Sequence, residues 1–269
     1  MIKSRNVNMD FAISIAAYII EMLQEDYLDV NNWFKYYDVL EIALKKWKKP
    51  EKETLVHCYI KDLYLNSLDY TLDKHFPVEV IDEIQNLLEN YNVDYSTIGK
   101  IDISGLPFDE YTDELRDYAY KLREFLCDEM LDIIVDDVFS VLYMDKNFLY
   151  EFNRQCSEII RYLKKSEYSD LKIFGENGAI ERATPPGWLK KGIEYRDKGR
   201  CSLCGCNLST SFTMCDNKNF DHIIPLKLGG NNDPSNWQLT CEKCNKTKGA
   251  RNSEFKNIVF PFWEDKEKH

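Results

Sequence analysis

The stretch CSLCGCNLSTSFTMCDNKNFDHIIPLKLGGNNDPSNWQLTCEKCN, residues 201–245, decides how the C-terminal part of this chain folds. A Cys-x-x-Cys knuckle stands at each end of it, and the four cysteines are Cys201, Cys204, Cys241 and Cys244. Tetrahedral zinc takes four soft ligands, and two such knuckles supply four thiolates. Cys206 and Cys215 are alternative ligands, although neither has a knuckle partner. We therefore predict a structural zinc that clamps the two ends of an inserted substructure.

The residues between the knuckles predict two short strands and a helix. Residues 219–226, NFDHIIPL, read as the first strand, and residues 236–240, NWQLT, read as the returning strand. Gly229–Gly230 marks the loop that joins them. A helix is expected over residues 241–248, so the predicted unit is strand, loop, strand and helix.

In this order and spacing, the residues resemble the HNH endonuclease family, whose members share the ββα-metal fold. The resemblance covers about residues 184–255, and residues 1–182 resemble no family that we recognise. The matching pieces are the two knuckles, Asp221-His222-Ile223-Ile224-Pro225-Leu226, Gly229-Gly230, Asn236-x-Gln238-Leu239-x-Cys241 and Cys244-Asn245-x-x-Lys248.

The resemblance implies a role for each polar residue of this pattern. His222 matches the general base that activates water, and Asn236 matches the residue that braces the loop and orients the histidine. Asp221 and Asn245 match the ligands of a catalytic divalent ion. An asparagine ligand favours a hard, oxygen-preferring ion such as Mg²⁺. The implied reaction is metal-dependent hydrolysis of a phosphodiester bond.

Basic residues near this pattern are candidate phosphate contacts. They are Lys227, Lys246, Lys248 and Arg251, with Lys243 as a further candidate. DNA is the expected substrate, and the sequence does not distinguish it from RNA. One site cuts one strand, so cleavage of both strands predicts a homodimer or two encounters.

The charge of the chain is divided unevenly between its two parts. The net charge is −11, yet residues 183–269 carry 14 basic and 10 acidic residues, whereas residues 1–182 carry 21 basic and 36 acidic residues. The N-terminal part is therefore acidic and is a poor partner for phosphate. Apolar residues at spacings of three and four predict helices in it. The expected helices cover residues 10–23, 33–47, 53–68, 77–91, 109–142 and 147–165.

These patterns predict an α+β chain, in which an all-α N-terminal domain precedes a small zinc-stabilised ββα-metal (HNH) domain. The expected boundaries are an acidic helical domain at 1–165, a linker at 166–183 and the HNH nuclease domain at 184–269. We expect the helical domain to regulate the nuclease or to dock a protein partner.

The cellular setting follows from weaker signals. No apolar run is long enough to span a bilayer, the N-terminus lacks the layout of a signal peptide, and the cysteines number nine. A cytoplasmic location without membrane contact is therefore expected. Because loose nuclease activity would harm its host cell, we hypothesise an effector of a prokaryotic defence system or mobile element. The alternative is a non-catalytic zinc-ribbon-like module that binds nucleic acid or protein, with His222 in a structural role.

Overall fold

The computed structural model describes residues 9–25, 29–209 and 218–249. Its internal contacts divide the chain into two compact units. The first unit comprises Met1–Leu28 and Val56–Leu142, and the second comprises Asp29–Leu55 and Tyr143–His269. The second unit is thus assembled from two separate segments of chain. Within the described ranges, no helix is long and apolar enough to cross a membrane.

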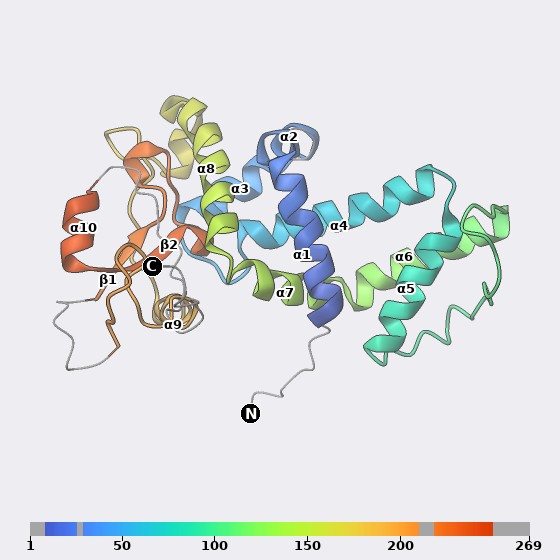
Figure 1. The fold of residues 1–269 in the computed structure, drawn as a ribbon. Coiled ribbons are helices and arrows are strands. Elements are labelled where there is room, and N and C mark those ends of the chain that lie inside the picture. The colour runs from blue at the N-terminus through green and yellow to red at the C-terminus, as the bar shows by residue number, and fades with distance from the viewer. Residues whose placement is uncertain (1–8, 26–28, 210–217, 250–269) are drawn as a thin grey trace, which may run out of the picture. The chain divides into compact units, whose positions relative to one another are not determined.

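The first unit consists of helices. They are α1 (Met9–Gln24), α4 (Leu55–Asp73), α5 (Pro77–Asn90), α6 (Asp113–Glu129) and α7 (Leu131–Leu142). α1 packs against α7, and α5 packs against α6 (Figure 1). Pro77 opens α5, where its missing N–H costs nothing. Most of the buried side chains are periodic apolar residues of these helices, and Gln85 and Asp137 are buried polar residues among them.

The single helix expected over residues 109–142 is wrong, because the chain forms two helices there. The side chain of Thr112 accepts a hydrogen bond from Leu115 N and caps α6, so the helix begins later than expected. Met130 leaves helical geometry at φ −127° and ψ −22° and separates α6 from α7. A straight helix over that range would be about 50 Å long. The break lets α6 pack on α5 while α7 packs on α1.

The second unit combines helices with a small sheet. Its helices are α2 (Val30–Tyr36), α3 (Leu40–Lys48), α8 (Lys146–Tyr162), η1 (Lys165–Leu171), α9 (Gly187–Arg196), η2 (Leu226–Leu228), η3 (Pro234–Asn236) and α10 (Glu242–Lys248). Its strands are β1 (Lys218–His222) and β2 (Trp237–Cys241). The predicted fold class is confirmed: the chain is mostly helical, with a two-stranded sheet near its C-terminus.

The helix expected over residues 33–47 is also two helices. Tyr37 is extended, at φ −115° and ψ 134°, and ends α2. Phe34 stacks on Trp47 with 5.5 Å between ring centroids. In one straight helix these residues would lie about 20 Å apart. The aromatic contact therefore requires the chain to fold back between α2 and α3.

The two strands are antiparallel and pair Asp221 with Gln238 and His222 with Trp237. A small apolar core lies beneath them, where α9 packs on β2. Its buried members are Leu189, Ile193, Cys201, Leu208, Trp237, Leu239 and Cys241. This core joins the sheet to the cysteine knuckles.

The segment expected to be a linker, residues 166–183, has structure of its own. It contains most of η1 and a turn closed by an antiparallel bridge between Phe174 and Ile180. α8 and this segment belong to the same compact unit as the strands. The functional boundaries at residues 165 and 184 stay a prediction.

Candidate functional site

Four cysteine sulfurs form a cluster in which all the ligand atoms lie within 4.8 Å of one another. They belong to Cys201, Cys204, Cys241 and Cys244, the four residues of the two knuckles. Zn–S bonds of about 2.3 Å in a tetrahedron place sulfurs about 3.8 Å apart. Cys204 Sγ and Cys241 Sγ lie 3.9 Å apart, so the cluster fits a zinc ion.

The pKa values of the cluster thiols differ: burial raises the pKa of Cys201 and of Cys244, whereas the pKa of Cys204 is lowered. Cys244 N donates to Cys241 Sγ at 3.4 Å, as expected for a tight knuckle turn. Burial works to raise the pKa of Cys204, but hydrogen bonds from Cys206 and from neighbouring thiols lower it to about 7. Cys206 is thus close to the cluster without being one of its four members. Cys215 lies outside the described residues.

A buried charged group supports the cluster from the side of α8 and α9. The carboxylate of Asp197 accepts from Arg196 Nε at 2.9 Å and from Leu239 N at 2.7 Å. Lys146 Nζ of α8 lies 3.2 Å from the same carboxylate. Although burial works to raise it, the pKa of Asp197 is lowered, chiefly by the charge of Arg196. This ion pair network ties α8 to the strand that carries Cys241.

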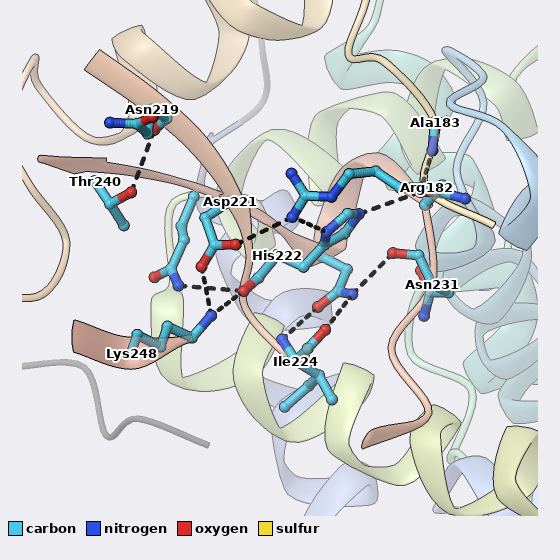
Figure 2. A network of polar contacts seen from close by, with 12 residues as sticks. Arg182, Ala183, Asn219, Asp221, His222, Ile224, Asn231, Thr240 and Lys248 are labelled. Carbon is cyan, nitrogen blue, oxygen red and sulfur yellow. Dashed lines mark hydrogen bonds and ion pairs between the residues drawn. The ribbon is translucent and has the colours of Figure 1, made fainter. Parts of the chain in front are cut away.

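The carboxylate of Asp221 lies at the centre of a second polar site, at the C-terminal end of β1. Lys248 Nζ of α10 donates to Asp221 Oδ2 at 2.7 Å, and it also donates to the backbone oxygen of His222. Arg182 Nη2 lies 3.4 Å from Asp221 Oδ1 (Figure 2). Two oxygens therefore converge on one cation position, which the ammonium of Lys248 occupies.

The ring of His222 is buried, at 1% exposure, and both of its nitrogens have partners. Arg182 Nη2 lies 3.3 Å from Nδ1, and Asn232 Oδ1 lies 3.2 Å from Nε2. A guanidinium can only donate, so Nδ1 must accept and Nε2 must carry the proton. The ring also packs on Trp237 with 3.9 Å between centroids. His222 is therefore held as one defined neutral tautomer.

Electrostatics keep this histidine neutral. Burial lowers the pKa of His222 to about 3, and the positive charges of Arg182 and Lys248 act in the same direction. The Nδ1 lone pair is consequently unprotonated at neutral pH. It faces Arg182 Nη2 (Figure 2).

Asn232 organises the surroundings of this histidine. Its Nδ2 donates to the backbone oxygens of Trp47, Lys48 and Glu181 at 3.2, 3.0 and 2.8 Å. Its Oδ1 accepts from Ala183 N at 3.0 Å as well as facing His222 Nε2. One fully buried amide thus joins the end of α3, the 181–183 segment and the histidine ring.

Asn236, the residue for which the resemblance implies both bracing and orientation, contacts the loop rather than the ring. Its Oδ1 accepts from Ile224 N at 2.8 Å, and its Nδ2 donates to Ile224 O and Asn231 O at 3.1 and 2.9 Å. The hydrogen bonds of the His222 ring go to Asn232 and Arg182 instead. The role of Asn236 in catalysis stays a prediction.

A pocket of about 740 Å³ lies beside Asp221. One wall comes from the loop after β1 and includes Pro225, Leu226 and Lys227. The other comes from residues 175–182 and includes Glu181 and Arg182. The carboxylate of Asp221 and the basic side chains of Arg182 and Lys227 thus line one pocket, and the buried His222 contacts Arg182 from behind this lining.

The remaining predicted residues are placed as follows. Lys246 is exposed and pairs with Glu242 one turn away, and Asn245 is half-buried on α10, one turn before Lys248. Lys248, by contrast, is buried against Asp221. Lys243 is exposed. Arg251 lies outside the described residues.

Sequence reasoning missed Arg182 and Asn232. Arg182 lies in the stretch read as a linker, and no motif marks it. Asn232 follows the Gly229–Gly230 pair within the run Asn231-Asn232-Asp233. Three consecutive side chains that bind backbone groups, in a loop between two strands, were the available signal.

Comparisons with known proteins address only the C-terminal part of the chain. No curated protein and no solved structure gives a significant match. Residues 201–251 match the family model described as HNH endonuclease, and this match begins at the first knuckle. The resemblance seen in the sequence is confirmed, and the four-cysteine cluster is consistent with a zinc-binding form of that domain. Residues 201–251 of this chain thus match the HNH endonuclease family.

Proposed function

We propose that this protein is a metal-dependent endonuclease that hydrolyses phosphodiester bonds in DNA. The observation that carries the proposal is the Asp221 carboxylate at a pocket with basic side chains, one of which, Arg182, also contacts His222 Nδ1. Hydrolysis needs a water nucleophile, a base and neutralisation of the phosphate charge. The HNH match supports the same class of reaction.

The chain's own residues divide this work. His222 accepts the proton of the attacking water at Nδ1 once Arg182 Nη2, which faces this nitrogen, turns to the substrate, because Nε2 already carries the proton that faces Asn232. The fixed tautomer removes the need to reorient the ring during the reaction. Arg182 and Lys227 face the pocket and attract the anionic substrate. The proton on Nδ1 then returns to solvent or to the leaving oxygen.

The residues fit an oxygen-preferring ion such as Mg²⁺. Asp221 Oδ2 and the backbone oxygen of His222 already converge on the ammonium of Lys248. Asn245 lies one helical turn from Lys248, and residues at this spacing face the same side of a helix. A divalent ion held by Asp221 and Asn245 would neutralise charge at the scissile phosphate. It would take the place of the Lys248 ammonium, which would then be available to the phosphate.

A plasmid-nicking assay with Mg²⁺ or Mn²⁺, with and without EDTA, tests the proposal. His222→Ala should lower the nicking rate by about 10²- to 10⁴-fold, the usual contribution of a general base. It should keep one zinc per chain, because His222 is not one of the four clustered residues. His75→Asn is the control, since His75 is an exposed residue of the first unit. Equal rates for wild type and His222→Ala would refute the role of His222.

A non-catalytic binding module is the second candidate, and the burial of the site favours it. His222 is 1% exposed, and Lys248 occupies the carboxylate of Asp221. This candidate predicts that no divalent ion produces cleavage and that His222→Ala binds DNA as wild type does. DNA binding measured on the zinc-loaded protein without added Mg²⁺ or Mn²⁺, beside the nicking assay, separates the two candidates.

We also propose that the acidic N-terminal part restrains the nuclease or docks a protein partner, in a defence system or mobile element. The observation behind this is the concentration of 36 acidic residues in residues 1–182. Shielding by these charges predicts that nicking first rises and then falls as salt is added, because salt screens surface charges. A rate that only falls with salt would contradict it. A protective effect against phage that is lost in His222→Ala would support the defence role.

A further inference from the structure

The pocket beside Asp221 is only half built from the HNH domain. The family match begins at residue 201, whereas the wall formed by Gly175, Ala179 and Arg182 precedes it in the chain. This wall belongs to the same compact unit as the strands. Its turn is closed by hydrogen bonds from Gly175 N to Ala179 O at 2.8 Å and from Glu181 N to Ile173 O at 3.0 Å. The wall is therefore an ordered part of the site.

Arg182 is the basic residue of this wall that reaches the reacting groups. Its side chain is 58% exposed, yet Nη2 lies 3.4 Å from Asp221 and 3.3 Å from His222 Nδ1. Within the described part of the chain, both contacts use Nη2, and a guanidinium has five N–H donors arranged in a planar fork. The other donors can therefore bind the oxygens of a phosphate that lies between His222 and solvent.

The pocket continues away from Asp221 into a second hollow of about 490 Å³. The two hollows share four lining residues, which are Asn177, Ala179, Leu226 and Lys227. The second hollow ends at Ile160 and Arg161 of α8. Arg161 is exposed, and its Nε donates to Ser157 O at 3.1 Å. We call the two hollows together the 161–182 groove. Basic side chains thus stand at its two ends, Arg182 and Arg161, with Lys227 between them.

A glycine holds α8 against the loop that carries Lys227. Gly229 has φ +88°, and a Cβ atom there would lie 2.5 Å from Ser157 O and 3.0 Å from Arg161 Cγ. No other residue type fits this approach without a shift of the loop or the helix. Asn231 Nδ2 also donates to Asn153 Oδ1 of α8 at 3.1 Å. The position of Arg161 relative to Lys227 is therefore fixed by close backbone packing.

We propose that the 161–182 groove carries the cleaved DNA strand, with Arg182 binding the scissile phosphate and Lys227 and Arg161 binding flanking phosphates. Arg182 and Arg161 both come from outside the HNH match, so this nuclease site is completed by residues that the family pattern does not contain. The proposal rests on the proposed function for the scissile phosphate, but the groove as a phosphate track does not require cleavage. Glu181 and Asp221 also line the pocket, and both are acidic groups that oppose a strand there.

Nicking kinetics of the full-length protein distinguish the role of Arg182 from that of Arg161. Arg182→Ala should lower kcat by about 10²- to 10³-fold, the usual effect of removing a donor from a developing charge, while KM changes little. Arg182→Lys should recover part of the rate, since it keeps the charge and loses the fork. Arg161→Ala should raise KM and leave kcat within about twofold. Unchanged kcat in Arg182→Ala, or a faster rate, would overturn the assignment of Arg182.

Binding to a short fluorescein-labelled DNA duplex without added divalent ion, at full zinc content, tests the groove without any cleavage. Each lost phosphate contact should reduce the slope of log affinity against log salt by about 0.9. Arg161→Ala, Lys227→Gln and Arg182→Ala should each show this loss. Lys191→Gln is the matched control, because Lys191 is exposed on α9 and lines neither hollow. Slopes equal to that of Lys191→Gln would refute the proposal that the groove binds DNA phosphates.

The two assays also separate this proposal from the proposed function. If no divalent ion supports nicking by the wild type, the proposed endonuclease activity is refuted. The salt slopes still test whether the groove binds DNA. A second outcome is that the wild type nicks DNA while the salt slopes and kcat values of the variants equal those of Lys191→Gln. That result would support the endonuclease and refute the groove as a binding site for the DNA strand. Zinc content and melting temperature, measured on every variant, verify that the fold is retained.

Discussion

Replacement of Asn232 by alanine should destabilise the second unit and release the His222 ring. The amide makes contacts with Trp47 O, Lys48 O, Glu181 O, Ala183 N and His222 Nε2, and it is fully buried. Backbone oxygens tolerate the loss of one partner better than donors do. The main cost therefore comes from the two donors that lose their acceptor, Ala183 N and His222 Nε2.

The size of this effect can be worked from those two donors. A buried donor without an acceptor costs about 1–3 kcal/mol. Because Ala183 is only half-buried, two donors at the lower part of this range give about 3 kcal/mol. For a protein of this size, 1 kcal/mol shifts the melting temperature by about 2–4 °C. Asn232→Ala should therefore melt about 6–12 °C below the wild type.

Thermal melts measure the loss of stability, and nitrogen NMR of the imidazole reports the tautomer. The proton should reside on Nε2 in the wild type and also in Asn232→Ala, because Arg182 still faces Nδ1, but the Nε2 resonance should shift when this N–H loses its acceptor. Asn31→Ala is the control, since Asn31 is an exposed residue of α2 with a weak side-chain contact at 3.4 Å. A melting temperature equal to that of Asn31→Ala, with an unchanged Nε2 resonance, would refute the assignment of Asn232 as the organising residue.

Three further predictions concern the metal cluster, the Asp221 site and pH. Cys204→Ser should lose its zinc by elemental analysis, whereas Cys206→Ser should keep one zinc per chain, because Cys206 is outside the cluster; loss of zinc in both would contradict this ligand set. Lys248→Met should lower stability by about 3 kcal/mol without added divalent ion, because it leaves the carboxylate of Asp221 without its buried partner, and Mn²⁺ should raise its melting temperature more than that of the wild type. Equal Mn²⁺ shifts would show that Lys248 does not compete for this carboxylate. The lowered pKa of Asp197 means that its contribution is full above the unfolded pKa of about 3.9 and is lost as pH falls through the folded pKa. Urea titrations should therefore show a smaller acid-side loss of stability in Asp197→Asn than in the wild type, and parallel curves would count against the ion pair.

The parts of this fold that the sequence predicts depend on residues close together in the chain. Each cysteine knuckle is one turn, and the strand, loop, strand and helix order follows from one stretch, so both were predictable. Helical periodicity located most helices, but it could not show that Tyr37 and Met130 interrupt two of them. Those breaks are set by packing between helices, which leaves no periodic signal.

The candidate site was predictable only where its partners are local. Asp221, His222 and Asn236 follow from the pattern between the knuckles. Arg182 acts on residues about 40 positions away, and Asn232 binds a backbone oxygen 185 positions away. No short motif contains such pairs. Lys248 was predicted as a phosphate contact, and its burial against Asp221 depends on how α10 packs on β1.

The assembly of the second unit from two segments sets an order of events during synthesis. Leu55 N donates to Asp233 Oδ2 at 2.8 Å, across 178 residues of sequence. At about 5–20 residues per second, the ribosome makes these partners about 10–35 s apart. Throughout that interval, α2 and α3 lack the strands that complete their compact unit. The nascent chain therefore cannot form the His222 site until almost the whole described sequence has been made.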